Sequence, residues 1–382
     1  YPNLVPWVDT PTGYSDIGDE YPFLCPIRLF YYAKDHGFPI NISYTNETLP
    51  ENAFYPIGIS WFDFSLDFFA LMSEQVRGYL REGRLRALFY YHEGDNPHHE
   101  KARLDQLCRE HNLPPNCYRF ISGNTEADGI DNFVYFADHE LFYWRNSVKW
   151  NNRSMPGVSY HNRPRSHRYT ALNRIHKWWR ATAMADLHRN NLLTNSYWSY
   201  NTEVNIADRF EDNPIEIDTL EIREYLTEFL SQGPYRADIL DSSQHNDHSL
   251  IETAHYTNSY CNIVLETHFD ADQSGGTFLT EKTFKPIKHG QPFIIVGPAG
   301  SLATLRNLGY RTFDHAIDNS YDLETNNTQR WLRVLDAIQQ IKQQDMHRWF
   351  KLCQVDIEHN QRLFASSKAE RLNNLLRKLK TI

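Results

Sequence analysis

The sequence predicts an α/β protein built from two Rossmann-like domains that face a cleft. Short apolar runs bounded by glycine, proline or polar residues recur along the chain, as at 85–91 and 292–296. Such runs fit buried strands of a parallel sheet. Between them lie stretches with apolar residues at helical spacing, such as 66–81. Because this alternation occurs in both halves of the chain, it indicates two parallel sheets.

The amino-terminal half opens with an arm. Residues 1–50 are rich in tyrosine, proline and aspartate, so we expect extended chain with one short helix near 26–36. Ser65 is a suitable N-cap for the first long helix, and Pro114-Pro115 follows the second. The expected strands are 57–59, 85–91 and 118–122, and the expected helices are 66–81 and 100–111.

The polar stretch 149–156 is the expected domain boundary, which gives domains 1–155 and 156–382. A second α/β set follows, with a polar excursion over the surface at 203–248. The expected strands are 158–160, one within 192–200, 262–265 and 292–296. The expected helices are one through Leu172, Ile175 and Trp179, then 219–231, 283–289, 331–341, 348–364 and 371–379.

Composition argues against several classes of protein. The 382 residues carry a formal charge of −9, which disfavours general affinity for nucleic acids. Five scattered cysteines without a Cys-X-X-Cys motif argue against a zinc site or a disulfide framework. Reduced thiols predict a cytoplasmic protein. No apolar run approaches the ~20 residues that a membrane span needs.

The candidate ligand site lies where a strand, a loop and a helix meet. The strand 262–265 runs into Glu266, and the next helix is preceded by Thr280-Glu281-Lys282. Ligands of open α/β sheets bind at such junctions. A carboxylate can accept two ribose hydroxyls, and an ammonium or the first helical N–H groups can meet a diphosphate. Spacing alone favours the simpler interpretation, a solvated Glu-Lys pair on a surface helix.

The same stretch resembles the donor-binding motif of the α-1,3-fucosyltransferase family. The residues in register are Thr280, Glu281, Lys282, Gly290, Pro292, Gly297 and Pro298. It also resembles uncharacterised phage and viral glycosyltransferase-like proteins. Their longer pattern continues here as Gly300-Ser301-Leu302, Leu305-Arg306 and Leu308-Gly309.

The resemblance covers 156–320 well and 57–124 loosely. It implies a GT-B glycosyltransferase, whose donor nucleotide sugar binds the carboxyl-terminal domain and whose transfer is inverting and independent of metal. The implied partners are a nucleotide sugar and a glycan or other hydroxyl-bearing acceptor, with no cofactor. Because the fucose-specific parts are not recognisable, the resemblance implies some nucleotide sugar and not GDP-fucose.

The sequence 162–168 brings three arginines together, namely Arg163, Arg165 and Arg168. Guanidinium groups are preferred partners of phosphate, although a solvated basic loop is a common alternative. Related glycosyltransferases carry an arginine-bearing loop at the first strand-to-helix turn of the donor domain. The resemblance therefore implies that these arginines and Lys282 stabilise the leaving nucleoside diphosphate.

Acidic residues supply the remaining candidates. The family has an acidic residue near the donor at the strand end that matches Glu266, for which a structural cap is the alternative. Asp270-Ala271-Asp272 spells a metal-binding DxD, but three-letter patterns are weak and we discount it.

The candidate general base is Glu93, with Asp95 as its substitute and Asp63 next. Glu93 and Asp95 follow the strand 85–91, and an inverting transfer needs a carboxylate to take the acceptor proton. The fucosyltransferases carry a loosely similar stretch at this place. An ordinary acidic turn is an equal alternative.

Two other functions stay open. One is a module that holds a glycan or nucleotide on a GT-B scaffold without catalysis. The other is a phage-type DNA-base glycosyltransferase. That enzyme would need a basic groove, which the net charge disfavours but the stretches 162–189 and 371–380 allow.

Overall fold

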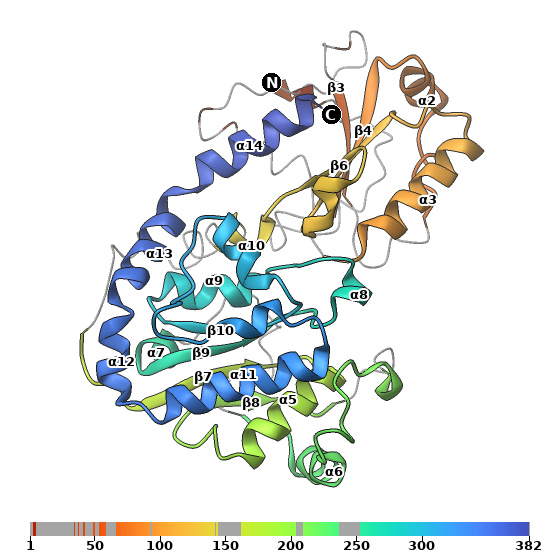
Figure 1. Cartoon of the computed structure of the whole chain (residues 1–382). Helices are drawn as coiled ribbons and strands as arrows, with labels where there is room; N and C mark the ends of the chain where they lie inside the picture. The colour runs from red at the N-terminus through yellow and green to blue at the C-terminus, as the bar shows by residue number, and fades with distance from the viewer. Residues whose placement is uncertain are drawn as a thin grey trace. The chain divides into compact units, whose positions relative to one another are not determined.

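The computed structural model describes residues 3–4, 34, 37, 41–42, 49, 53–58, 66–91, 94–141, 143, 162–203, 209–236 and 253–381 (Figure 1). The chain divides into two compact units. The first contains 1–138, 272–278 and 367–382, and the second contains 139–271 and 279–366. Two segments placed in the carboxyl-terminal domain by the sequence, 272–278 and 367–382, thus belong to the first unit. The predicted boundary between residues 155 and 156 lies outside the described residues.

The first unit is built on a parallel sheet with the order β2-β1-β3-β4-β5-β6. Its strands are β1 (Asn3–Leu4), β2 (Asn41–Ile42), β3 (Ala53–Gly58), β4 (Leu85–Tyr91), β5 (Tyr118–Ser122) and β6 (Phe133–Tyr135). The predicted strands 85–91 and 118–122 are confirmed, and the predicted 57–59 is the end of the longer β3. In its core the rings of Phe120 and Phe133 stack with centroids 4.6 Å apart.

Capping side chains set the helix starts in this unit. Helix α2 (Glu74–Arg81) begins later than predicted because Ser73, not Ser65, is its N-cap and accepts a hydrogen bond from Val76 N. Helix α3 (Pro97–Glu110) begins earlier than predicted because Asn96 caps it and Pro97 occupies its first position. Helix α14 (Lys368–Thr381) and the 3₁₀ helix η1 (Thr125–Gly129) complete the unit. The helix predicted near 26–36 lies outside the described residues except for Lys34.

The second unit contains a parallel sheet with the order β10-β9-β7-β8. The strands are β7 (His167–Asn173), β8 (Tyr197–Tyr200), β9 (Ser259–Leu265) and β10 (Phe293–Val296). The helix predicted through Leu172 was placed too early in the sequence. Leu172 belongs to β7, and helix α5 (Trp178–Arg189) begins after a turn. The predicted strand 158–160 lies outside the described residues.

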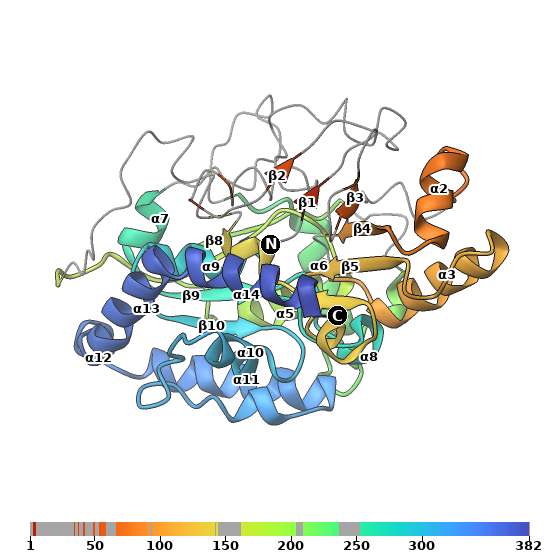
Figure 2. The same cartoon turned by 90° about the horizontal axis from the view of Figure 1, so that it is seen from above.

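The helices of the second unit confirm most of the helices that the sequence predicts there. They are α6 (Arg223–Gln232), α7 (Thr253–Thr257), α9 (Glu281–Lys288), α10 (Ser301–Asn307), α11 (Asn327–Lys342), α12 (Met346–Leu352) and α13 (Gln354–Ser366), with η2 (Phe210–Asp212) and η3 (Ser320–Leu323). The helix α8 (Ala271–Ser274) spans the change of unit. The single helix predicted at 348–364 is two helices, α12 and α13. In Figures 1 and 2 these two helices run along the same side of the second unit as α7.

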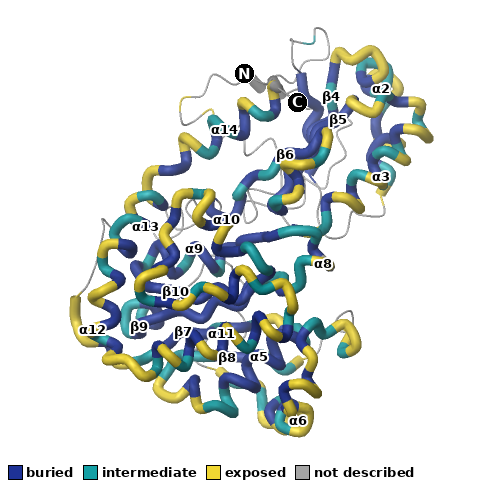
Figure 3. Tube along the Cα trace, in the orientation of Figure 1, coloured by how far each residue is buried: buried dark blue, intermediate teal, exposed yellow. Residues whose placement is uncertain are grey.

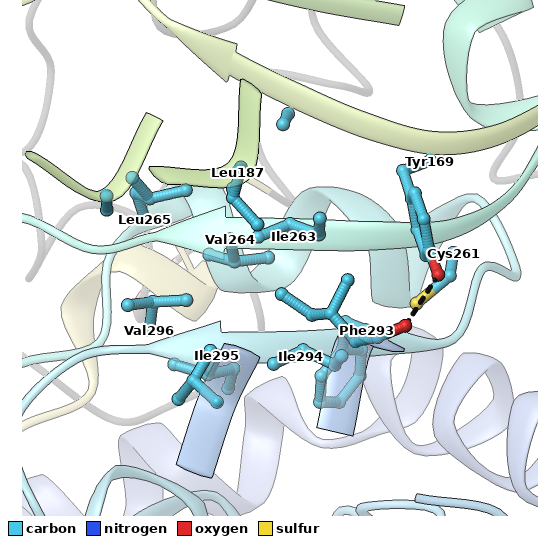
Figure 4. Packing of buried hydrophobic residues seen from close by; sticks show 14 of the residues in the cluster. Tyr169, Leu187, Cys261, Ile263, Val264, Leu265, Phe293, Ile294, Ile295 and Val296 are labelled. Carbon is cyan, nitrogen blue, oxygen red and sulfur yellow. Dashed lines mark hydrogen bonds between the residues drawn. The ribbon is translucent and has the colours of Figure 1, made fainter. Parts of the chain in front are cut away.

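The core of the second unit lies around its two central strands. Every residue of β9 and β10 is buried (Figure 3). Ile263, Val264 and Ile294 pack with neighbouring aliphatic side chains in this core (Figure 4). Tyr169 of β7 joins them, and its hydroxyl donates to the carbonyl of Ile338 in α11 at 3.0 Å. This packed sheet is the support that fixes the loops at its carboxyl edge.

Candidate functional site

The strand order of the second unit creates a position where ligands commonly bind. From β7 the chain moves to β8 on one side, and β9 lies on the other side of β7. In doubly wound sheets the loops that leave two such strands diverge, and ligands bind between them at the carboxyl edge. Here those loops follow Asn173 at the end of β7 and Leu265 at the end of β9.

Glu266 follows β9 and organises this edge. Its side chain is fully buried. Oε1 accepts from Thr280 N at 3.1 Å and from the Thr283 hydroxyl at 2.6 Å. Oε2 accepts from the Thr280 hydroxyl at 2.6 Å and from Thr267 N at 3.2 Å. Four donors match the approximately four acceptor sites of a carboxylate, so Glu266 fixes the start of α9 and retains little capacity to bind a ligand.

Three cationic side chains converge on the residues that follow β9. Lys177 Nζ donates to the carbonyl of Thr267 at 2.7 Å, and Lys282 Nζ lies 3.4 Å from the hydroxyl of the same residue. The guanidinium of Arg180 donates through Nε and Nη2 to the carbonyl of Glu266. Carbonyl oxygens orient Lys177 and Arg180, while Lys282 is also paired with the carboxylate of Glu281. The structure thus brings three cationic groups, Lys177, Arg180 and Lys282, together at the carboxyl edge.

The helix starts at this edge differ in how they are capped. Thr280 caps α9 and is itself bonded to Glu266. Both oxygens of Asp322 accept N–H groups of α10, from Leu302 at 2.8 Å and Ala303 at 3.0 Å. In contrast, Lys177 stands at the N-cap of α5 and supplies no side-chain cap. The amino end of α5 therefore suits an anion better than that of α9, contrary to our expectation from the sequence.

A buried amide lies at the same edge. Asn173 ends β7 and is 5% exposed. Its Nδ2 has no hydrogen-bond partner among the described residues. Because a buried donor without a partner costs free energy, this amide is a candidate contact for an acceptor group of a ligand.

Glu281 is the first residue of α9 and is also buried. One carboxylate oxygen lies 3.2 Å from Nζ of Lys282, and the other lies 3.5 Å from Nδ1 of His139. The Glu281-Lys282 pair is thus an internal ion pair with a partly exposed lysine, not the fully solvated pair of the simpler interpretation. Sequence reasoning placed Thr280, Glu281, Lys282 and Glu266 near one another, and the structure brings them together.

The arginines of 162–168 lie at the opposite edge of the same sheet, which corrects their proposed place in the site. Arg163 and Arg165 precede β7 and Arg168 is its second residue, whereas Lys282 lies beyond the end of β9, and the seven residues of β9 span about 23 Å. Arg165 is buried and donates to the carbonyls of Tyr256 and Ser259 at 2.9 and 2.6 Å. The structure therefore does not bring these arginines to the Glu281-Lys282 junction.

The neighbours of Arg165 make similar structural contacts. Arg163 donates to Asn258 Oδ1 at 2.7 Å and to the carbonyl of Thr257, and Arg168 donates to the carbonyl of Lys342 at 2.9 Å. Carbonyls at the carboxyl end of a helix attract cations, so Arg163 and Arg165 stabilise the end of α7. The physical reason for the wrong prediction is the position of the strand, which begins at His167, among the arginines, and not before them.

The cationic residues that the structure does bring to the site were missed by sequence reasoning. Lys177 and Arg180 flank the start of α5, directly after β7. A signal existed in the run 169–173, a short, mostly apolar strand followed by Arg174. Because that run was interpreted as helix, the strand-to-helix turn that follows it was not predicted.

The candidate base residues belong to the first unit. Glu93 and Asp63 lie outside the described residues. Asp95 follows β4, is exposed, and accepts a hydrogen bond from the Tyr91 hydroxyl at 2.6 Å. Asp95 therefore lies at the carboxyl edge of the first sheet, as the sequence predicts, and its oxygen is oriented by a buried tyrosine.

The segment 272–278 packs against the same edge of the first sheet. The buried Asn124, two residues after β5, donates through Nδ2 to the carbonyl of Gly94 at 2.9 Å and of Ser274 at 2.6 Å. Thr125 N donates to the carbonyl of Thr277 at 3.1 Å. Asn124 thus ties the turn that carries Asp95 to the segment 272–278.

Within the described ranges no group of three or more His, Cys, Asp or Glu side chains is placed to hold a metal ion, and Asp270 and Asp272 form no such group. None of the described helices is long and apolar enough to cross a membrane. Comparisons with protein-family models, curated proteins and solved structures found no match.

We expect Glu266→Gln to lower the free energy of unfolding by about 1–3 kcal/mol. The new amide group replaces an oxygen that accepts hydrogen bonds, so donors of Thr280 or Thr283 lose their partner. Urea unfolding measures the change. Glu224→Gln on the exposed face of α6 is the control and should stay within about 0.5 kcal/mol. Equal stability of both variants would contradict the structural role of Glu266.

We expect Gly94→Ala to displace the segment 272–278, because a Cβ at Gly94 would lie 2.0 Å from the ring of Phe278. Hydrogen exchange of 272–278 should become faster, and stability should fall by about 1–3 kcal/mol. Adding Phe278→Ala removes the clash, so the double variant should lose less than the sum of the single changes. Gly78→Ala, with open space around its Cβ in α2, should instead stabilise by about 0.5–1 kcal/mol. Unchanged exchange in Gly94→Ala is the contradicting result.

Proposed function

We propose that the protein is a glycosyltransferase that transfers a sugar from a nucleotide-sugar donor to a hydroxyl-bearing acceptor. The observation that carries the proposal is the convergence of Lys177, Arg180 and Lys282 on the residues after β9. A nucleoside diphosphate is the leaving group of such donors, and fixed cations stabilise the negative charge that develops on it. The resemblance of the Thr280-Glu281-Lys282 stretch to fucosyltransferases supports the same assignment.

In this proposal the diphosphate binds at the amino end of α5. The N–H groups of the first turn and the macrodipole of a twelve-residue helix favour an anion there. Lys177 and Lys282 would approach the phosphate oxygens from the two sides of Thr267. Asn173 would donate its amide N–H to the same ligand, and the carboxylate of Glu281 would accept a ribose hydroxyl.

The proposal extends to the arrangement of the two units as a GT-B enzyme. The first unit would bind the acceptor, and Glu93 or Asp95 would take the proton from its hydroxyl during an inverting transfer. Tyr91 supports Asp95 in this role because its hydrogen bond fixes the carboxylate while leaving the second oxygen to accept the proton. The leaving diphosphate would be stabilised by the chain's own cations.

The donor site is tested by nucleotide binding. A thermal-shift panel of UDP, GDP, CMP and dTDP identifies the ligand, and calorimetry then measures its affinity. Lys282→Ala should weaken binding about tenfold or more, because a charge-assisted contact contributes about 1.5–3 kcal/mol. Lys285→Ala on the same helix is the matched control and should bind normally.

A second variant separates this site from the arginine loop. Arg165→Ala should lower the melting temperature, because buried carbonyls lose their donor, yet leave nucleotide affinity unchanged. Normal affinity in both Lys282→Ala and Lys177→Ala would contradict the proposed donor site. Lost affinity in Arg165→Ala without lost stability would return the arginines to it.

The general base is tested by turnover, measured as release of nucleoside diphosphate from the donor identified in the panel. Glu93→Gln or Asp95→Asn should reduce turnover by ~10²–10⁴-fold while nucleotide affinity stays normal. The variant with the larger loss identifies the base. If both variants keep normal turnover, the base lies elsewhere, and Asp63 is the next residue to substitute.

The same assay tests the prediction that no metal is required. Turnover should persist in EDTA, because Lys177, Arg180 and Lys282 supply the positive charge at the leaving group. A loss in EDTA that Mn²⁺ restores would contradict this part of the proposal and direct attention to Asp270 and Asp272.

A further inference from the structure

Two buried cysteines face one another in the first unit and are not part of the candidate site. Cys108 lies in the last turns of α3, and Cys117 immediately precedes β5. Both side chains are buried, and their sulfur atoms are 3.6 Å apart. The sequence alone argues against a disulfide framework, since its five cysteines are scattered, and gives no reason to pair these two.

Hydrogen bonds fix the backbone around both cysteines. Leu113 N donates to the carbonyl of Cys108 at 2.8 Å, and Cys117 N donates to the carbonyl of Pro114 at 3.0 Å. Ala87 N of β4 donates to the carbonyl of Cys117 at 2.8 Å. From their separation of 3.6 Å the two sulfurs must approach by roughly 1.5 Å to reach the bond length of a disulfide. Side-chain rotation near the end of a helix can supply a movement of this size.

We propose that Cys108 and Cys117 are a peroxide-oxidised dithiol that closes to an internal disulfide. The Cys108 thiolate attacks one oxygen of hydrogen peroxide and the O–O bond breaks. This gives a sulfenic acid on Cys108 and a hydroxide, which is protonated to water. The Cys117 sulfur then attacks the Cys108 sulfur, the S–O bond breaks, and a second water leaves. Two thiols and one peroxide give one disulfide and two waters, so each sulfur loses one electron and the peroxide gains two.

The surroundings of Cys108 make it the attacking sulfur. The hydrogen bond with Cys117 lowers the pKa of the Cys108 thiol, while the same contact and burial raise the pKa of Cys117. The thiolate is the reactive form, so Cys108 reacts first. Cys261 and Cys353 are also buried, but burial raises the pKa of both thiols. They are matched internal controls in the same chain.

The test uses the full chain treated with hydrogen peroxide, followed by alkylation of remaining thiols in denaturant and tryptic digestion. Arg109 separates the two cysteines, so the disulfide joins the peptides 104–109 and 110–119. We expect this cross-linked pair, about 2 Da lighter than the two thiol peptides together, and its loss on reduction. Cys261 and Cys353 should still be alkylated. The oxidised protein should also unfold at a higher urea concentration than the reduced protein, since the bond restricts the unfolded chain.

Variants identify the order of the steps. Cys117→Ser should stop at a sulfenic acid on Cys108 that dimedone traps, and Cys108→Ser should leave Cys117 alkylated as a thiol. The proposal is overturned if Cys108 advances to a sulfinic acid in the intact protein without the cross-link. It is also overturned if either thiol pairs with Cys25, or if both remain alkylated after the peroxide treatment. All three results are obtained with the intact protein and hold even if a substitution prevents folding.

Discussion

The buried carboxylate of Glu266 is the interaction on which the candidate site depends. A carboxylate without partners in a protein interior is very costly, and this one is satisfied by two backbone N–H groups and two threonine hydroxyls. Those four donors come from Thr267, Thr280 and Thr283, on both sides of the long loop between β9 and α9. The carboxylate therefore closes that loop at its base. The position of Lys282 follows from this closure, because its helix starts where Thr280 is held.

The cations at this edge are oriented by the oxygen atoms to which they donate. Lys177 and Arg180 donate to carbonyl oxygens, whereas Lys282 also pairs with the carboxylate of Glu281. A carbonyl orients a cation without offsetting its charge, whereas the carboxylate of Glu281 offsets part of the charge of Lys282. Burial strengthens the field of these groups, since the surrounding dielectric is low. Such an arrangement suits the anion site that we propose at this edge, where a bound phosphate would accept charge-assisted hydrogen bonds.

The sequence allowed the junction after β9 to be predicted but not the one after β7. The run 262–265 is apolar and ends in Glu266, so the strand and its polar end were both visible, and Thr280-Glu281-Lys282 was placed correctly beside them. The strand His167–Asn173 begins with histidine and arginine and has a tyrosine and a threonine among its buried residues, so its pattern resembled a helix start. Because this strand was interpreted as helix, the arginines predicted to bind phosphate lie at the amino edge of the sheet and not at its carboxyl edge. Contacts such as those of Glu266 with Thr283 depend on tertiary packing and leave no local signal. The general base stays a prediction, since Glu93 lies outside the described residues.

The segment 272–278 belongs to the first unit, although the residues on both sides of it belong to the second. The chain passes between the units after residues 138, 271, 278 and 366. A single cut in the chain therefore cannot release either unit intact, and a fragment that begins near residue 156 would lack partners for 272–278 and for α14. Expression of isolated halves should expose the apolar face of α14, with its buried Leu372, Leu375 and Leu376. Dissection would have to replace 272–278 with a short artificial linker, so that the second unit becomes one uninterrupted polypeptide.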